Sequence, residues 1–318
     1  MKYVAICAKG LEDMTQLEIK ELLNVNSEIL IPGRVVFETE DIARFISKTQ
    51  SAIKVYELRQ HVKSLEEIKT FQIEGKFKVS CSRKGAHKFC SMDVEKEIGK
   101  RFFEKGNKVD LKKPELIVFV DIVDEDYFVG IDLTPILLSK REYRIKIHNQ
   151  SINSCIAYGL VRLSGFDENK TLLDPFTKDG IIVIEAARYK EGNIFALDEL
   201  FPCVRNVEIN SKLAGLRKGI NVSRMAVEWL DTKFQEKEID CVVSAIPFAS
   251  KTVPENTIKK IYKELFYQLD FILKKNGKVV LISPKIGLLK EMNENLKIIE
   301  ERRVSTNSLD YDVIVFKK

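Results

Sequence analysis

A chain of 318 residues is long enough for two domains, and a composition of 45% hydrophobic and 31% charged residues excludes a disordered protein. Its apolar runs fall short of the roughly 18–20 residues of a membrane-spanning helix, so no membrane association is expected. The formal net charge of +5 does not by itself indicate a nucleic-acid partner, and acids interrupt the apolar start of the chain too early for a secretory signal.

Strands and helices alternate along the first 135 residues. Strands are predicted where β-branched and aromatic residues gather, at 4–8, 31–39, 77–83, 116–123 and 127–133. Helices are predicted where apolar residues recur at a spacing of three and four, at 12–24, 41–52 and 91–106. The acidic turn at 124–126 is expected to join the last two strands into a hairpin.

The cysteines and histidines of the chain do not form a recognisable site. Six cysteines stand at positions 7, 81, 90, 155, 203 and 241 without a Cys-x-x-Cys pair, and the chain has only three histidines. Zinc motifs and disulfide frameworks need a different spacing, so no metal site is expected. Buried free thiols in a reducing compartment, the cytoplasm, are the simpler interpretation.

From about residue 151 the strands and helices alternate regularly, which predicts a mostly parallel, doubly wound sheet. The predicted strands are 171–176, 193–199, 225–231, 239–245 and 277–283, followed by an antiparallel pair at 296–304 and 310–318. The predicted helices are 151–166, 180–190, 203–215 and 256–275. Ligands bind at the carboxyl ends of the strands in such sheets, and three predicted strands end near Asp174, Asp198 and Asp231.

Basic residues gather in two places. Residues 76–113 hold twelve Lys and Arg against five Asp and Glu. One cluster consists of Arg83, Lys84, His87 and Lys88, and a second consists of Lys140, Arg141, Arg144 and Lys146. Such clusters neutralise phosphates and give a salt-sensitive affinity for RNA. A solvated charged face is the alternative interpretation.

Residues 77–133 resemble a THUMP domain, an RNA-binding module of tRNA-modifying enzymes. The resemblance depends on Arg-x-Gly-x-His at 83–87, Ile98-Gly99, and Val109-Asp110-Leu111 before Pro114. The second half resembles a Rossmann-fold methyltransferase of the tRNA guanine-N2 type. Its motifs follow in the expected order: LVRLSGF, LLDPFTKDGIIVIEAA, Asp198, Asn210, Gly215 and DCVVSAIPFAS.

The resemblance implies an α/β architecture: a Rossmann-fold methyltransferase domain, with a doubly wound sheet and an antiparallel end, preceded by an α+β ferredoxin-like plus THUMP module. The expected domains are an N-terminal ferredoxin-like domain at 1–62, a THUMP domain at 63–135, a linker at 136–150 and a methyltransferase-like domain at 151–318. The partner implied by the resemblance is tRNA.

The resemblance also implies a site for S-adenosylmethionine at the strand ends. The residues that would hold this cofactor are Asp174, Phe176 and Gly180 in one loop, Asp198 at the ribose hydroxyls, and Asp231 at the adenine amino group. A carboxylate suits the ribose because its oxygens accept several hydrogen bonds. Helix N-caps or exposed strand-end acids are the alternative interpretation of the aspartates.

The loop that follows the first of these strands departs from the family pattern. Where the family has Asp-Pro-Phe-Cys-Gly-Ser-Gly, this chain has Lys178 in place of the first glycine and Asp179 in place of the small residue. A side chain at a turn with positive φ costs about 1 kcal/mol. An inward lysine would also repel the sulfonium, whereas an outward one would leave room for it. S-adenosylmethionine is therefore expected to be possible but weakened or absent.

The substrate end departs from the pattern as well. Enzymes that methylate an amino group on a base carry Asn/Asp-Pro-Pro-Tyr/Phe where this chain has Ala245-Ile246-Pro247-Phe248, and Ser244 stands one residue earlier. Ala245 cannot accept a hydrogen bond from the amine, and loss of one such group typically costs about 10²–10³ in rate. Strand alternation points the Ser244 hydroxyl away from the amine. Phe248 either stacks on the extruded base or fills the core.

Two altered motifs in one chain favour a pseudoenzyme: a tRNA-binding protein with impaired or lost methyl transfer, which would hold tRNA for a protein partner or keep the cofactor for structure. The alternative is an active tRNA (guanine-N2-)-methyltransferase with a divergent active site, so enzymatic activity is left open. A small-molecule methyltransferase is disfavoured by the basic clusters and the THUMP resemblance.

Overall fold

The computed structural model describes residues 1–216, 218–251, 253–306 and 309–318, and these form two compact units. The first unit comprises Met1–Cys7 and Thr15–Leu138, and the second comprises Ala8–Met14 and Ser139–Lys318. Within the described residues, no helix combines the length and apolar character that crossing a membrane requires.

A short early segment, Ala8–Met14, therefore belongs to the second unit. Lys9 and Ser305 exchange two backbone hydrogen bonds, with N···O distances of 2.9 and 3.0 Å. Leu11 is buried in the same core, so close to Gly159 that a Cβ added at Gly159 would lie 2.6 Å from a Leu11 methyl carbon. The second unit thus closes its core with residues from the start of the chain.

The first unit is built on a single sheet, which within the described residues has seven strands in the order β2-β3-β1-β4-β7-β6-β5. Its strands are β1 (Lys2–Ile6), β2 (Ser27–Ile31), β3 (Arg34–Glu38), β4 (Lys54–Val62), β5 (Phe77–Lys84), β6 (Leu116–Val123) and β7 (Asp126–Asp132). Its helices are α2 (Ile42–Lys48), α3 (Ser91–Glu104) and α1 (Glu12–Leu23) from Thr15 onward. The predicted hairpin is confirmed as β6 and β7.

The strand β4, which the sequence did not predict, pairs with β1 on one side and with β7 on the other. One sheet therefore runs through both of the N-terminal domains predicted for residues 1–62 and 63–135. A buried ion pair stabilises this sheet: Arg34 on β3 donates to Asp121 on β6, with 2.8 Å between Nη2 and Oδ1. The Tyr56 hydroxyl on β4 donates to the same carboxylate.

The second unit confirms the predicted doubly wound sheet with an antiparallel end. Its strand order within the described residues is β10-β9-β8-β11-β12-β14-β13. The strands are β8 (Thr171–Asp174), β9 (Asn193–Asp198), β10 (Asn221–Arg224), β11 (Ile239–Ala245), β12 (Leu273–Ser283), β13 (Lys297–Ser305) and β14 (Asp310–Lys317). The pairs from β10 to β12 are parallel, and β14 is antiparallel to both β12 and β13.

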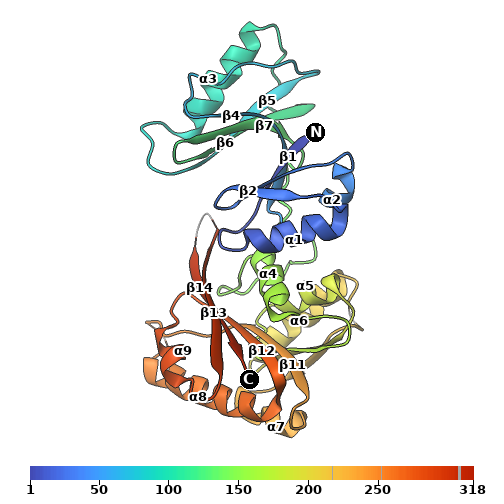
Figure 1. The fold of residues 1–318 in the computed structure, drawn as a ribbon, viewed down its shortest axis with the longest axis vertical. Coiled ribbons are helices and arrows are strands. Elements are labelled where there is room, and N and C mark those ends of the chain that lie inside the picture. The colour runs from blue at the N-terminus through green and yellow to red at the C-terminus, as the bar shows by residue number, and fades with distance from the viewer. Residues whose placement is uncertain (217, 252, 307–308) are drawn as a thin grey trace. The chain divides into compact units, whose positions relative to one another are not determined.

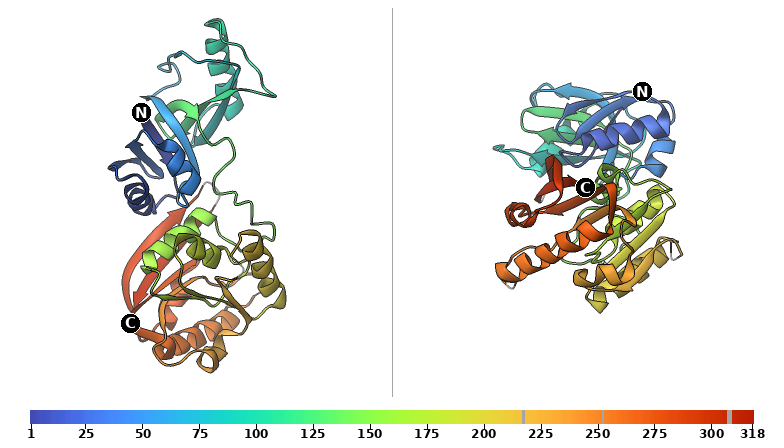
Figure 2. Two further views of the ribbon diagram at one scale, coloured as in Figure 1. Left: turned by 90° about the vertical axis from the view of Figure 1, so that its right-hand side faces the viewer. Right: turned by 60° about the horizontal axis from the view of Figure 1, so that its bottom comes forward.

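Helices cover both faces of this sheet (Figures 1 and 2). Under one face a hydrophobic core forms with α4 (Ser154–Ser164), α5 (Ile181–Tyr189) and α6 (Phe201–Leu213). Under the other face a second core forms with α7 (Leu230–Lys233), α8 (Glu255–Ile272) and α9 (Gly287–Met292). This layering leaves the carboxyl ends of the parallel strands together at one edge.

Two predictions about this unit are wrong. The predicted strand at 225–231 is a 3₁₀ turn (Val227–Trp229) followed by α7, and the strand lies earlier, as β10. Val227 and Leu230 are buried at a spacing of three, which is helical. The helix predicted to reach residue 275 ends at Ile272, and β12 begins at the next residue.

Candidate functional site

A cleft lies at the carboxyl ends of β8, β9 and β10. Its volume is about 430 Å³, and it is lined by Pro175, Phe176, Glu199, Met225, Ala226, Val227, Glu228 and four residues of α8. A neighbouring hollow shares Glu199, Met225 and Ala226. The position is the one predicted for a doubly wound sheet. The sequence did not single out Glu199, Met225 or Ala226, although Glu199 and Met225 directly follow the ends of β9 and β10 and Ala226 comes next.

Asp198, at the end of β9, is held at the base of this edge. The residue is 6% exposed. Its Oδ2 accepts from the backbone N–H of Lys178 at 3.0 Å, and its Oδ1 accepts from that of Leu200 at 3.0 Å. Each carboxylate oxygen has more than one acceptor site, so both can accept a further bond from a diol. The carboxylate is therefore fixed in place and still chemically available.

The loop between β8 and α5 has the left-handed backbone that suits the glycines of the family pattern. Lys178 has φ of +54° and Gly180 has φ of +81°, so both lie in the left-handed region that favours glycine. A Cβ at Gly180 would lie 2.9 Å from a Val207 methyl carbon, so glycine also allows α5 to pack against α6. Lys178 adopts a conformation that disfavours its own side chain.

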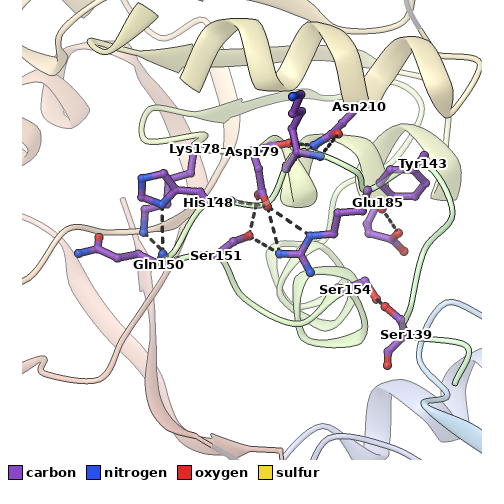
Figure 3. A network of polar contacts seen from close by, with 12 residues as sticks. Ser139, Tyr143, His148, Gln150, Ser151, Ser154, Lys178, Asp179, Glu185 and Asn210 are labelled. Carbon is purple, nitrogen blue, oxygen red and sulfur yellow. Dashed lines mark hydrogen bonds and ion pairs between the residues drawn. The ribbon is translucent and has the colours of Figure 1, made fainter. Parts of the chain in front are cut away.

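Asp179 is the centre of a polar network rather than a defect in the loop (Figure 3). Its Oδ2 accepts from Arg144 Nη2 at 3.1 Å and from the His148 backbone N–H at 3.3 Å. Its Oδ1 accepts from the Ser151 hydroxyl at 2.6 Å. Asn210 on α6 donates to the Asp179 carbonyl and to the Lys146 carbonyl. These bonds tie the segment 144–151 to the β8–α5 loop.

The network corrects two RNA-binding predictions, those for Arg144 and Arg141. The Arg144 side chain is 13% exposed and pairs with Asp179, whose carboxylate is fully buried. The Arg141 side chain is 6% exposed and pairs with the buried Glu185, which also accepts from the Tyr143 hydroxyl. Both guanidinium groups are bonded inside the second unit, so they do not form an RNA-binding surface.

Replacing Asp179 by asparagine is expected to lower the free energy of unfolding by about 2 kcal/mol, because Arg144 loses its charged partner in a buried site. Chemical denaturation measures this change. Glu301→Gln is a matched control, because the Glu301–Lys290 pair is more than one-third exposed on both sides and costs less than about 1 kcal/mol to break. Equal stability of the Asp179 variant and the wild type contradicts the central role of Asp179.

Asp174, at the end of β8, is a buried carboxyl group. It is 1% exposed and accepts from the Ser244 hydroxyl at 2.5 Å and from the Phe176 backbone N–H at 3.2 Å. Burial raises the pKa of Asp174 to about 7, although these hydrogen bonds lower it in part. Ser244 is thus a partner of Asp174, and its hydroxyl does not serve as the missing amine acceptor.

The end of β11 lies beside the end of β8, its parallel partner, and presents the predicted motif. Ala245 and Ile246 are buried, whereas Pro247 and Phe248 are half-buried. The Tyr262 hydroxyl of α8 donates to the Pro247 carbonyl at 2.5 Å and fixes the turn. Phe248 belongs to neither hydrophobic core that the described residues form in this unit. The interpretation of Phe248 as a core residue is therefore wrong.

Asp231 lies apart from these groups. It is an exposed residue of α7, and its backbone N–H donates to Gln268 Oε1 at 2.9 Å. Since Arg224 pairs with Asp198 in the parallel register, Met225 is the residue that follows the strand end. The strand-end position predicted for Asp231 is wrong, and Met225 and Ala226 line the cleft instead.

The first basic cluster lies at the end of β5 and in the loop that follows. Lys84 and Lys88 are exposed. Arg83 Nη1 donates to the Gly85 carbonyl at 3.3 Å and lies 3.1 Å from His87 Nδ1, while His87 Nε2 lies 2.6 Å from the Asp124 carbonyl. Arg83 and His87 therefore shape the loop that presents the two lysines. Lys140, from the second cluster, is also exposed.

Comparison with protein families gives two matches. A family described as "RMKL-like, methyltransferase domain" matches residues 141–311, and the THUMP domain family matches residues 54–132. The second match includes β4, which precedes the boundary predicted at residue 63.

Similar proteins cover nearly the whole chain. The tRNA (guanine(6)-N2)-methyltransferase of Archaeoglobus fulgidus is 27% identical over 99% of this chain and 92% of its own. The enzyme of the same name from Methanocaldococcus jannaschii is 25% identical over 97% of this chain and 98% of its own. Among solved structures, TrmN from Thermus thermophilus matches with a TM-score of 0.83 and 24% identity, covering 100% of this chain and 99% of that one. The structure of SMU.472 in complex with SAH matches with a TM-score of 0.78 and 17% identity, covering 99% of this chain and 97% of that one. These two structures support the fold.

Proposed function

Because the chain belongs to the family of RMKL-like methyltransferase domains and carries a THUMP domain, we propose that it is a tRNA (guanine-N2-)-methyltransferase that uses S-adenosylmethionine. The main support is the similarity to two archaeal tRNA (guanine(6)-N2)-methyltransferases over nearly the full length of both chains. The cleft at the strand ends supports the same conclusion, because it lies where this fold binds its ligands.

The residues at the cleft fit the adenosyl part of the cofactor. Met225, Ala226 and Phe176 offer an apolar lining for a base, and Asp198 offers two fixed carboxylate oxygens for the ribose hydroxyls. S-adenosylmethionine, when bound, supplies the methyl group from a sulfonium. The role of the protein itself is to hold the nucleoside and to exclude water from the strand ends.

At the end of β11 the chain's residues would hold the target guanine. Phe248 is half-buried and available to stack on an extruded base, and the Tyr262 bond to Pro247 keeps the turn rigid. Ala245 contributes no side-chain acceptor, so backbone carbonyl groups of this turn must hold the amino group. A tRNA-binding role without methyl transfer is the second candidate function, and Ala245 is the observation that favours it.

The test is to incubate the protein with S-adenosylmethionine and unmodified tRNA transcripts, and to analyse the digested nucleosides by mass spectrometry. The expected product is guanosine with one added CH₂ group, identified as N2-methylguanosine by its retention time. The Asp198→Ala variant is the matched control and should give no product. Unmethylated tRNA that nevertheless binds the wild-type protein would support the second candidate.

Replacing Lys84 and Lys88 together by alanine is expected to weaken tRNA binding and to reduce the slope of log K against log salt concentration by about 1.5, because two phosphate contacts are lost. Fluorescence anisotropy across a salt series measures both quantities. The control is Lys237→Ala with Lys297→Ala, two exposed lysines of the second unit. An unchanged slope in the Lys84/Lys88 variant contradicts this RNA-binding assignment.

A further inference from the structure

Lys178 places an ammonium group inside the second unit. The residue is 8% exposed, and its Nζ lies 3.3 Å from the Gln150 carbonyl oxygen (Figure 3). Among the residues that the structure describes, this carbonyl is its one hydrogen-bond acceptor. An ammonium group carries three N–H donors, so two of them lack a protein acceptor. A buried charge bonded so incompletely is costly unless a ligand completes its bonding.

The backbone at Lys178 adds to this cost. Its φ of +54° is a conformation that glycine adopts without strain, whereas a residue with a Cβ loses about 1 kcal/mol. The backbone geometry therefore does not explain a lysine at this position. The loop holds a side chain that is unfavourable for its backbone and incompletely bonded at its charged end, a combination that is typical of functional sites.

The carboxylates around Lys178 are engaged elsewhere. Asp179 pairs with Arg144, Asp198 accepts two backbone N–H groups, and Asp174 accepts from Ser244 and Phe176. In the described part of the chain, none of them comes within ion-pair distance of the ammonium. Burial, and then the charge of Lys178, lowers the pKa of His148, so this neighbouring ring is neutral at pH 7.

The position of the ammonium corresponds to one branch of the cofactor, provided that the proposed function holds. The sulfur of S-adenosylmethionine carries an adenosyl group, a methyl group and an aminocarboxypropyl chain. The cleft at the ends of β9 and β10 suits the adenosyl group, and the methyl group must face the end of β11. The remaining edge for the amino-acid chain is the β8–α5 loop, where Lys178 lies.

We propose that Lys178 is a specificity-determining residue that binds the carboxylate at the amino-acid end of the adenosyl cofactor. An ammonium–carboxylate hydrogen bond in a buried site is among the stronger ones in proteins. The carboxylate would supply acceptors for the N–H groups that the protein leaves without one. A glycine at this position would offer the carboxylate only backbone groups, whereas Lys178 offers it a charged contact.

The test compares two ligands by isothermal titration calorimetry: S-adenosylhomocysteine and its decarboxylated analogue, which lacks only the carboxylate. The wild-type chain is expected to bind S-adenosylhomocysteine about 10–100-fold more tightly than the analogue. Lys178→Met should lose this preference by weakening only the first ligand, and Lys178→Arg should retain most of it. Lys170→Met is the matched control, because Lys170 is a partly buried lysine that also donates to a backbone carbonyl, that of Gly165.

The outcomes separate this inference from the proposed function. If Lys178→Met binds S-adenosylhomocysteine as tightly as the wild type, or more tightly, the lysine does not recognise the carboxylate and the inference is wrong. That result leaves the proposed tRNA methyltransferase function standing. If the wild type shows the preference and Lys178→Met abolishes it, but no tRNA is methylated, the proposed function alone is contradicted. A wild-type chain that binds neither ligand overturns both.

Discussion

At pH 8, replacing Asp174 by asparagine is expected to raise the free energy of unfolding by up to about 4 kcal/mol. Burial raises the pKa of this carboxyl from 3.8 to about 7 in the folded chain. A difference of one in pKa corresponds to about 1.36 kcal/mol, so the ionised carboxylate destabilises the folded chain by about 4 kcal/mol. Asparagine keeps the shape of the side chain and removes the buried charge.

The sign of the pH dependence follows from proton binding. Between pH 3.8 and about 7 the folded chain keeps the Asp174 proton, whereas the unfolded chain releases it. The free energy of unfolding therefore falls as the pH rises through this range. Thermal unfolding at pH 5 and pH 8 measures the effect: Asp174→Asn should be clearly more stable than the wild type at pH 8 and much less so at pH 5.

Asp310→Asn is the matched control, because the Asp310 side chain is 58% exposed and pairs with an exposed arginine. It should change stability little at either pH. A stabilisation by Asp174→Asn that is equal at both pH values, or absent, contradicts the raised pKa. If the expected result is obtained, Asp174 is a residue that the fold retains against its own stability, which is usual for residues needed at a functional site.

Replacing Ala245 by asparagine is expected to raise the turnover of tRNA methylation by about 10²-fold. The end of β11 carries no side-chain acceptor for the target amine, and one preorganised group of this kind is typically worth 10²–10³ in rate. Ala245 ends the strand beside the half-buried Pro247 and Phe248, so the new amide lies at the motif position.

Initial rates at saturating tRNA and S-adenosylmethionine measure the turnover of the Ala245→Asn variant. Ala249→Asn is the control, because it adds the same amide four residues later, beyond the strand end. A rate equal to that of the wild type indicates that backbone carbonyl groups already hold the amine well. In that case the family motif at this position is dispensable in this chain.

The sheet of the second unit was predictable because its strands are apolar runs separated by helices of clear periodicity. The same periodicity is ambiguous over short stretches, which explains the failure at 225–231. There Val227 and Leu230 are compatible with a helical turn, whereas their neighbours alternate as in a strand. The placement of Asp231 depended on that error. In the first unit, β4 was missed because charged and polar residues interrupt its apolar ones.

The charged residues show a second limit of prediction from sequence. Arg141 and Arg144 stand in a basic cluster and carry the same charge as Lys84 and Lys88. Their partners, Glu185 and Asp179, follow tens of residues later, and only the packing of α5 and its loop brings each pair together. Substitutions that suggested a damaged loop also have a structural role, because Asp179 bonds to three residues of the preceding segment.

The segment Ala8–Met14 has a consequence for the order in which the chain folds during synthesis. Its backbone partner Ser305 lies on β13, which the ribosome releases long after this segment. The second unit therefore cannot close its core co-translationally until β13 has emerged. A protein fragment that starts at Ser139 lacks this segment, so it should expose the apolar surface that Leu11 covers and aggregate more readily. Protein fragments intended to isolate the methyltransferase domain should include residues 8–14, as an added peptide or as a fusion.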